Sequence, residues 1–133
     1  MKVHEFSVMQ QVVETVLSTV REKKGVIGVE EVTLEVGELT FLGHEPLRFS
    51  FQVLAENEPL LREAKLVLKE KKAVAKCPNC GYVGGLEYDE DISYHYAVPI
   101  FSCPRCGDVV DIVEGNECAI TNIRVVVDDE EPF

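Results

Sequence analysis

The residues best suited to chemistry are four cysteines in two C-P-x-C-G motifs, Cys77 with Cys80 and Cys103 with Cys106. Each Cys-x-x-Cys is expected to form a tight turn that directs two thiolates toward one point, and the glycine that follows relieves backbone crowding. Four sulfurs complete a tetrahedral Zn(II) site and leave no open position for catalysis. The motifs therefore predict a structural zinc site in a ribbon with little apolar core of its own.

Other uses of these cysteines stay open at this point. Two disulfides would leave Cys118 unpaired, and the absence of a secretory signal disfavours them. Iron is the stronger alternative, because paired C-x-x-C-G motifs also resemble those of rubredoxin and thiolate softness does not separate the two metals. Colour separates them, since ferric tetrathiolate is red and the zinc form is colourless. Cys118 itself lies among alternating apolar residues, which favours a small buried side chain over a soft nickel ligand.

The charge balance argues against nucleic acid as a partner. The 133 residues include 24 acidic and 13 basic side chains, for a net charge of −11. A phosphate-binding surface needs clustered lysine and arginine, whereas the segment between the cysteine pairs is acidic and rich in tyrosine. The basic cluster of Lys69, Lys71, Lys72 and Lys76 has the spacing of a solvated strand face. No apolar run is long enough to span a membrane, so we expect a cytoplasmic protein.

The elements that must position the cysteines form a small α+β fold. Apolar residues repeat every three or four positions in two segments, which predicts a helix from an N-cap at Ser7 to Gly25 and a helix from His44 to Asn57, with Pro46 in its first turn. Strands are predicted over residues 29–39, with an interruption at Gly37, and over 109–113 and 117–128. Residues 64–75 are predicted to form a strand or a long hairpin arm.

The cysteine ribbon is therefore expected as an insertion between two strands of a small mixed sheet that carries two helices. With 46% hydrophobic residues, the chain suits one globular domain with a small appendage. We assign residues 1–75 and 115–133 to the α+β domain and residues 76–114 to the zinc ribbon. The acidic tail after residue 128 is expected to fray.

His4 and Glu5 stand just before the first predicted helix, where a lone histidine is usually an ordinary surface residue. Their context changes this reading. The order H-E-F-S, V-x-L-E-V-G-E-L, P-L-R-F-S-F, two Cys-x-x-Cys pairs and G-N-E-C-x-I-x-x-I-R-V resembles the HypA family of hydrogenase nickel-incorporation proteins. The resemblance extends over essentially the whole chain, and the combination of motifs is specific.

This resemblance implies a metallochaperone with a nickel-binding α+β domain and an inserted zinc domain. Such proteins deliver Ni(II), as cargo, to [NiFe]-hydrogenase precursors and sometimes to urease, with the GTPase HypB as partner. The resemblance assigns His4 as the imidazole ligand of nickel and Glu5 as its neighbour in the site. It assigns structural zinc to the four cysteines of the two pairs.

The N-terminus departs from the family pattern, because Met-Lys-Val precedes His4 where the family usually has Met alone. The amine of Met1 is then too far along the chain to close the family's chelate rings. The His4 imidazole with the amides of His4 and Glu5 remains a suitable square-planar nitrogen set for Ni(II). His95, between the cysteine pairs, is a candidate for a further nitrogen, with an ordinary surface histidine as the alternative. His44 is expected to be a surface or capping residue.

Rival functions are a zinc-ribbon adaptor in transcription or translation and an iron electron carrier. The acidic balance disfavours the adaptor, in which His4 would be dispensable. No nucleophile–base pair, phosphate loop or paired carboxylates are recognisable, so we do not expect an enzyme. Nucleic acid and membranes are not expected as partners, and a homodimer stays open.

Overall fold

The computed structural model describes residues 3–86 and 101–128. They belong to two compact units, each described below by itself. The helical unit consists of Met1–Glu35, Leu42–Lys69 and Ala119–Phe133, and the ribbon unit consists of Val36–Phe41 and Glu70–Cys118. The α+β class with two helices and a cysteine ribbon, which the sequence predicted, is confirmed.

Two helices supply much of the core of the helical unit. Helix α1 spans Val3–Arg21 and helix α2 spans His44–Glu56, and the two pack against each other. Helix α1 buries one stripe of side chains at helical spacing, which consists of Met9, Val12, Val13, Val16, Leu17 and Val20. Helix α2 contributes Leu47, Phe51 and Ala55. The second helix thus begins at His44, as predicted, with Pro46 in its first turn.

The predicted start of the first helix is wrong. Helix α1 begins at Val3 rather than after Ser7, and Ser7 is an exposed residue inside it. The helix ends at Arg21, four positions before Gly25, where the Lys23 N–H bonds the Val20 carbonyl at 3.0 Å. Gly25 has a φ of 79° and is the last turn residue before the strand that begins at Val26. His4 and Glu5 therefore lie in the first helical turn.

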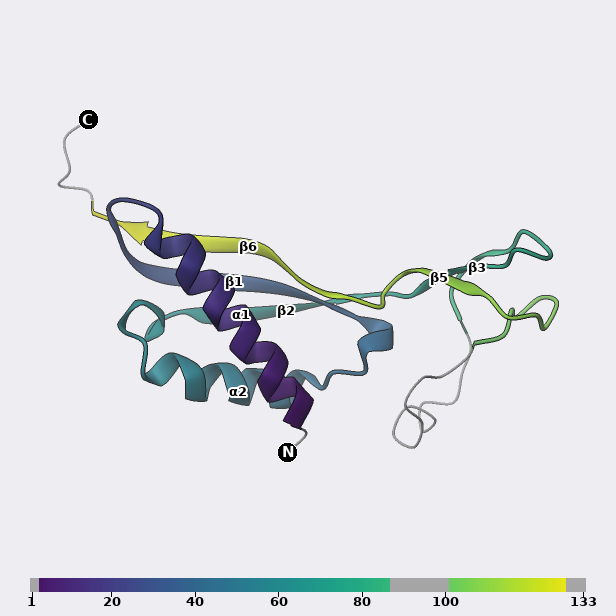
Figure 1. Ribbon diagram of the computed structural model, residues 1–133, viewed down its shortest axis with the longest axis horizontal. Helices are drawn as coiled ribbons and strands as arrows, with labels where there is room; N and C mark the ends of the chain where they lie inside the picture. Colours follow the sequence, from purple (N-terminus) through teal and green to yellow (C-terminus); the bar gives the residue numbers. More distant parts are fainter. Residues whose placement is uncertain (1–2, 87–100, 129–133) are drawn as a thin grey trace. The chain divides into compact units, whose positions relative to one another are not determined.

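The helical unit contains most of a three-stranded sheet in the order β2-β1-β6. Strand β1 spans Val26–Gly37, β2 spans Lys65–Lys71 and β6 spans Cys118–Val127. Strands β1 and β2 run in one direction and β6 runs in the other (Figure 1), so the sheet is mixed, as predicted. The central strand β1 contributes Val29, Val32 and Leu34 to the core of the helical unit.

The predicted single strand over residues 64–75 is wrong, because the segment divides between two sheets. Strand β2 ends at Lys71, and β3, Val74–Lys76, pairs in a second sheet. A short 3-10 helix, η2 at Pro59–Leu61, precedes β2, and another, η1 at Glu38–Thr40, follows β1. Gly37 is thus the last residue of β1 rather than an interruption within a longer strand.

The ribbon unit has its own sheet in the order β4-β3-β5, with β4 at Val83–Gly84 and β5 at Asp111–Glu114. Both neighbours pair antiparallel to β3, with Ala75 opposite Gly84 and Ile112. The predicted strand at 109–113 therefore starts two residues later and ends one residue later than predicted. Val109 instead makes an isolated bridge to Ser102. The final predicted strand corresponds to β6.

Candidate metal centre

The structure brings the four cysteines of the two motifs together. Their sulfur atoms all lie within 4.8 Å of one another. Cys77 Sγ is 3.5 Å from Cys106 Sγ, and Cys80 Sγ is 3.6 Å from Cys103 Sγ. A disulfide requires a bond of about 2.05 Å, and all five cysteines of the chain are free. A Zn–S bond of about 2.3 Å places tetrahedral sulfurs about 3.8 Å apart, so the cluster fits a tetrathiolate metal.

Each motif forms the same backbone turn. The N–H of Gly81 bonds the Cys77 carbonyl at 3.0 Å, and the N–H of Gly107 bonds the Cys103 carbonyl at 2.9 Å. The two glycines have φ angles of 79° and 85°, in the left-handed region that favours glycine. This is the physical reason for a glycine after the second cysteine of each pair, and it confirms the turn predicted from the motif.

Backbone amides point at two of the sulfurs. The N–H of Cys80 lies 3.5 Å from Cys77 Sγ, and the N–H of Arg105 lies 3.3 Å from Cys103 Sγ. Desolvation raises the pKa of Cys103, but hydrogen bonds from the backbone N–H groups of Cys106 and Arg105 and from the thiols of Cys80 and Cys106 together bring that pKa down to about 7. Amides that stabilise a thiolate prepare it to ligate a metal.

The neighbouring sulfurs act in the opposite direction on Cys80. The Tyr82 backbone N–H lowers the pKa of Cys80, whereas desolvation and the surrounding thiol groups together raise it to about 12. Four thiolates at this separation repel one another, so their full deprotonation requires a cation. With four sulfur ligands and no open position, Zn(II) in this site would hold structure rather than perform chemistry.

The metal has a structural task because the ribbon unit has few buried side chains. Its core cluster consists of Ala75, Cys77, Cys103 and Val110, so two of its four buried residues are cysteines. Such a core is too small to stabilise the turns on its own. Metal ligation supplies the folding stability that apolar burial does not. The cysteine cluster is therefore a structural zinc site.

The N-terminal candidates lie on the helical unit. His4 belongs to the first turn of α1. Glu5 is fully buried, and its Oε2 atom accepts a hydrogen bond of 2.9 Å from the backbone N–H of Gly43. Gly43 is the N-cap of α2. No local pattern in the sequence indicates this contact, because Glu5 and Gly43 lie 38 positions apart.

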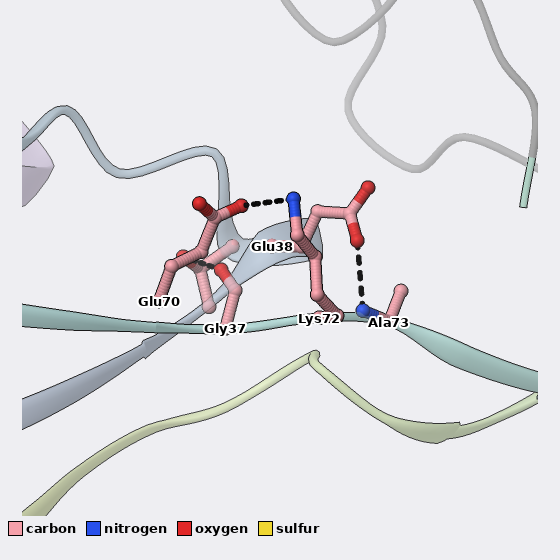
Figure 2. Close-up of polar contacts among 6 residues, drawn as sticks. Gly37, Glu38, Glu70, Lys72 and Ala73 are labelled. Atoms are coloured by element: carbon pink, nitrogen blue, oxygen red, sulfur yellow. Dashed lines mark hydrogen bonds and ion pairs between the residues drawn. The ribbon is translucent and has the colours of Figure 1, made fainter. Parts of the chain in front are cut away.

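The remaining candidates have less structural support. His95 lies outside the described residues, so its assignment stays a prediction. His44 is the partly buried first residue of α2. Cys118 begins β6 as a half-buried free thiol, and burial raises its pKa. Two lysines of the predicted basic cluster form ion pairs. Lys71 Nζ lies 3.9 Å from Glu114 Oε2, and Lys72 Nζ lies 3.3 Å from Glu70 Oε1 (Figure 2).

The fold and the cysteine cluster together define a class: a small α+β metal-binding protein with a zinc ribbon inserted between strands of its sheet. Within the described residues, no helix is long and apolar enough to cross a bilayer. The family model described as "Hydrogenase/urease nickel incorporation, metallochaperone, hypA" matches residues 3–125. The chain belongs to this HypA family and is a nickel metallochaperone of hydrogenase maturation.

Curated relatives match along nearly the full length of the chain. The hydrogenase maturation factor HypA of Methanococcus vannielii is 35% identical over 131 residues, which cover 95% of this chain and 99% of that protein. The HypA of Methanopyrus kandleri is 37% identical over 139 residues, with 96% of each chain covered.

Solved structures support the fold. The solution structure of the Ni metallochaperone HypA from Helicobacter pylori matches with a TM-score of 0.63 at 18% identity, covering 93% of this chain and 98% of that one. A second solution structure of a HypA protein matches with a TM-score of 0.66 at 19% identity, covering 96% and 100%.

Proposed function

We propose that this chain binds Ni(II) at the N-terminal turn that contains His4 and delivers it to a [NiFe]-hydrogenase large-subunit precursor. A HypB-type GTPase acts as its partner, and urease is a second destination of the metal. Nickel belongs to the domain of residues 1–75 and 115–133, and zinc to the domain of residues 76–114. The observation that carries the proposal is the anchored N-terminal turn, in a chain of the HypA family.

The first turn of α1 suits a nickel site built partly from backbone. The first four N–H groups of an α-helix have no intrahelical partner, and α1 begins at Val3. The amides of His4 and Glu5 are therefore not needed for the helix. Together with the His4 imidazole they supply nitrogen donors, which Ni(II) favours in square-planar geometry.

Glu5 enters this site through its backbone rather than its carboxylate. The side chain is fully buried and bonded to the Gly43 N–H, so ligation by its carboxylate would require that bond to break. We propose that the carboxylate holds the turn in place and the amide faces the metal. His95 would complete the donor set.

The nickel site and the cysteine site together support a role in metal transfer rather than in catalysis. A site with few anchored side chains can release its metal, whereas the tetrathiolate site retains zinc. We propose that Cys77, Cys80, Cys103 and Cys106 are the zinc ligands, that the protein is no enzyme, and that it acts in the cytoplasm. Its acidic surface supports protein partners rather than nucleic acid.

Equilibrium dialysis of the zinc-loaded protein against Ni(II) tests the proposal. The His4→Ala variant should lose about one equivalent of nickel and keep its zinc, because it lacks the imidazole donor. The matched control is His44→Ala, which removes an imidazole from the first turn of α2 instead and should bind nickel like the wild type. If wild type, His4→Ala and His44→Ala bind nickel equally, the alternative function, a zinc-ribbon adaptor, would be favoured.

A further inference from the structure

The third residues of the two cysteine motifs, Asn79 and Arg105, each reach across to the other half of the cluster. Asn79 Nδ2 lies 3.7 Å from the sulfur of Cys106, a residue 27 positions away in the chain. The guanidinium carbon of Arg105 lies 5.6 Å from the centre of the Tyr82 ring, which directly follows the first motif and is within range of a cation–π contact. Both contacts belong to the ribbon unit. The two motifs are therefore joined by side chains as well as by their sulfur atoms.

Cys106 is the most accessible member of the cluster. Cys77 and Cys103 are buried and Cys80 is partly buried, whereas Cys106 is exposed. A thiolate is a nucleophile, and its accessibility helps to determine how fast it reacts. A reagent that opens the cluster from the solvent would therefore meet Cys106 before it meets the buried sulfurs.

The buried and the accessible sulfurs receive different kinds of hydrogen-bond donor. Backbone N–H groups, those of Cys80 and Arg105, point at the two buried sulfurs at 3.5 Å and 3.3 Å. These donors are part of the folded turns. The donor at Cys106 is the side-chain amide of Asn79, which is itself an exposed residue. A substitution of Asn79 therefore removes the hydrogen bond at the accessible sulfur and leaves the backbone donors in place.

An amide nitrogen suits this position chemically. Asn79 Nδ2 carries two N–H donors, and a thiolate that ligates a metal is a charged acceptor. A hydrogen bond to a charged acceptor is stronger than one between neutral groups. Cys106 Sγ also lies 3.5 Å from Cys77 Sγ, so two thiolates at these places repel each other. The Asn79 amide offsets part of this repulsion at the sulfur that is most open to solvent.

We propose that Asn79 is a positioning residue for Cys106 and that it slows the loss of zinc at this sulfur. Its amide bonds the first motif to the sulfur of the second, and it stabilises the accessible thiolate against reaction with reagents from the solvent. This inference rests on the proposed assignment of the four cysteines as zinc ligands. Slow release of zinc keeps the structural metal in place while nickel, the cargo, is exchanged.

Zinc release from the nickel-free full chain to an excess of the chromophoric chelator pyridylazoresorcinol is the first test. Asn79→Leu has a side chain of similar size without an N–H donor, and it should release zinc about fivefold faster than the wild type. Asn79→Gln keeps the amide donor and should restore most of the slow release. The matched control is Asn122→Leu, at an exposed asparagine of β6, which should release zinc at the wild-type rate. Equal release rates in the wild type and Asn79→Leu would overturn the proposal.

Alkylation of the same zinc-loaded proteins by iodoacetamide, located by mass spectrometry, is the second test. In Asn79→Leu the first cluster cysteine to be modified should be Cys106, about fivefold faster than in the wild type, because its thiolate has lost the amide donor. Faster alkylation spread evenly over all four cysteines would indicate a general loosening of the ribbon unit and would also overturn the proposal. Failure of the zinc-site assignment is recognised separately, because the wild-type protein would then bind no zinc.

Discussion

The Oε2 atom of Glu5 accepts a hydrogen bond of 2.9 Å from the N–H of Gly43, a residue 38 positions away in the chain. This bond joins the first turn of α1 to the N-cap of α2. A buried carboxylate is costly unless it is hydrogen-bonded, and the N-terminal ends of helices are favourable places for a negative charge. The bond accounts for a fully buried glutamate beside the candidate nickel ligand.

Replacement of Glu5 tests this relationship. Glu5→Ala should lower the free energy of unfolding by about 2–4 kcal/mol, because it leaves the Gly43 N–H without this acceptor and opens a cavity. Glu5→Gln retains an acceptor and should cost less. Urea denaturation of the zinc-loaded proteins measures both. Glu14→Ala, an exposed site on the same helix, is the control and should change stability little; an equally stable Glu5→Ala would refute the anchoring role.

Zinc removal should affect the two units unequally. Chelation should unfold the ribbon unit, because half of its buried core cluster is cysteine. The helical unit has its own apolar core and should keep its helices. Circular dichroism and amide exchange before and after chelation report this difference. Loss of α1 and α2 together with the ribbon would show that the helical unit also depends on the metal.

The close backbone contacts around Gly37 predict that two glycine-to-alanine substitutions differ sharply in their effect on stability. Gly37→Ala should destabilise the protein by about 2–4 kcal/mol, because the new Cβ would lie 2.4 Å from a backbone oxygen that cannot move freely. Gly85→Ala is the control, since a Cβ there meets nothing within 4 Å. Thermal unfolding compares the two. If the Gly37→Ala protein is as stable as the Gly85→Ala protein, the close approach of Gly37 to the backbone of Gly115 and Glu117 is contradicted.

Cys118 should react slowly with thiol reagents at neutral pH. Burial raises its pKa, so the thiolate fraction at pH 7 is smaller than for an ordinary cysteine and grows as the pH rises. Alkylation of the zinc-loaded protein by iodoacetamide, followed at Cys118 by mass spectrometry, should therefore accelerate well into the alkaline range. Rapid modification at pH 7 that changes little with pH would contradict a desolvated thiol.

The parts of the fold that depend on local pattern could be predicted from the sequence. The cysteine pairs with their following glycines, the start of α2 at His44 and the final strand β6 all follow from spacing and turn chemistry. Local rules suffice there because each feature is determined by residues within one turn or one strand.

The features that were missed depend on contacts between distant residues. Helix α1 extends back to Val3, and its first turn includes Glu5, whose hydrogen-bond partner Gly43 lies far along the chain. The strand predicted over residues 64–75 divides near Ala73, whose N–H bonds Glu38. No periodic pattern in the sequence indicates such long-range hydrogen bonds.

Nickel transfer is the most direct test of the central claim. Zinc-loaded wild-type protein carrying one equivalent of radioactive nickel is mixed with purified hydrogenase large-subunit precursor, the two are separated, and the nickel in the precursor is counted. The wild type should pass most of its nickel to the precursor, whereas His4→Ala, mixed with the same total nickel, should pass no more than free Ni(II) does. Equal transfer by wild type and His4→Ala would contradict delivery from the N-terminal turn.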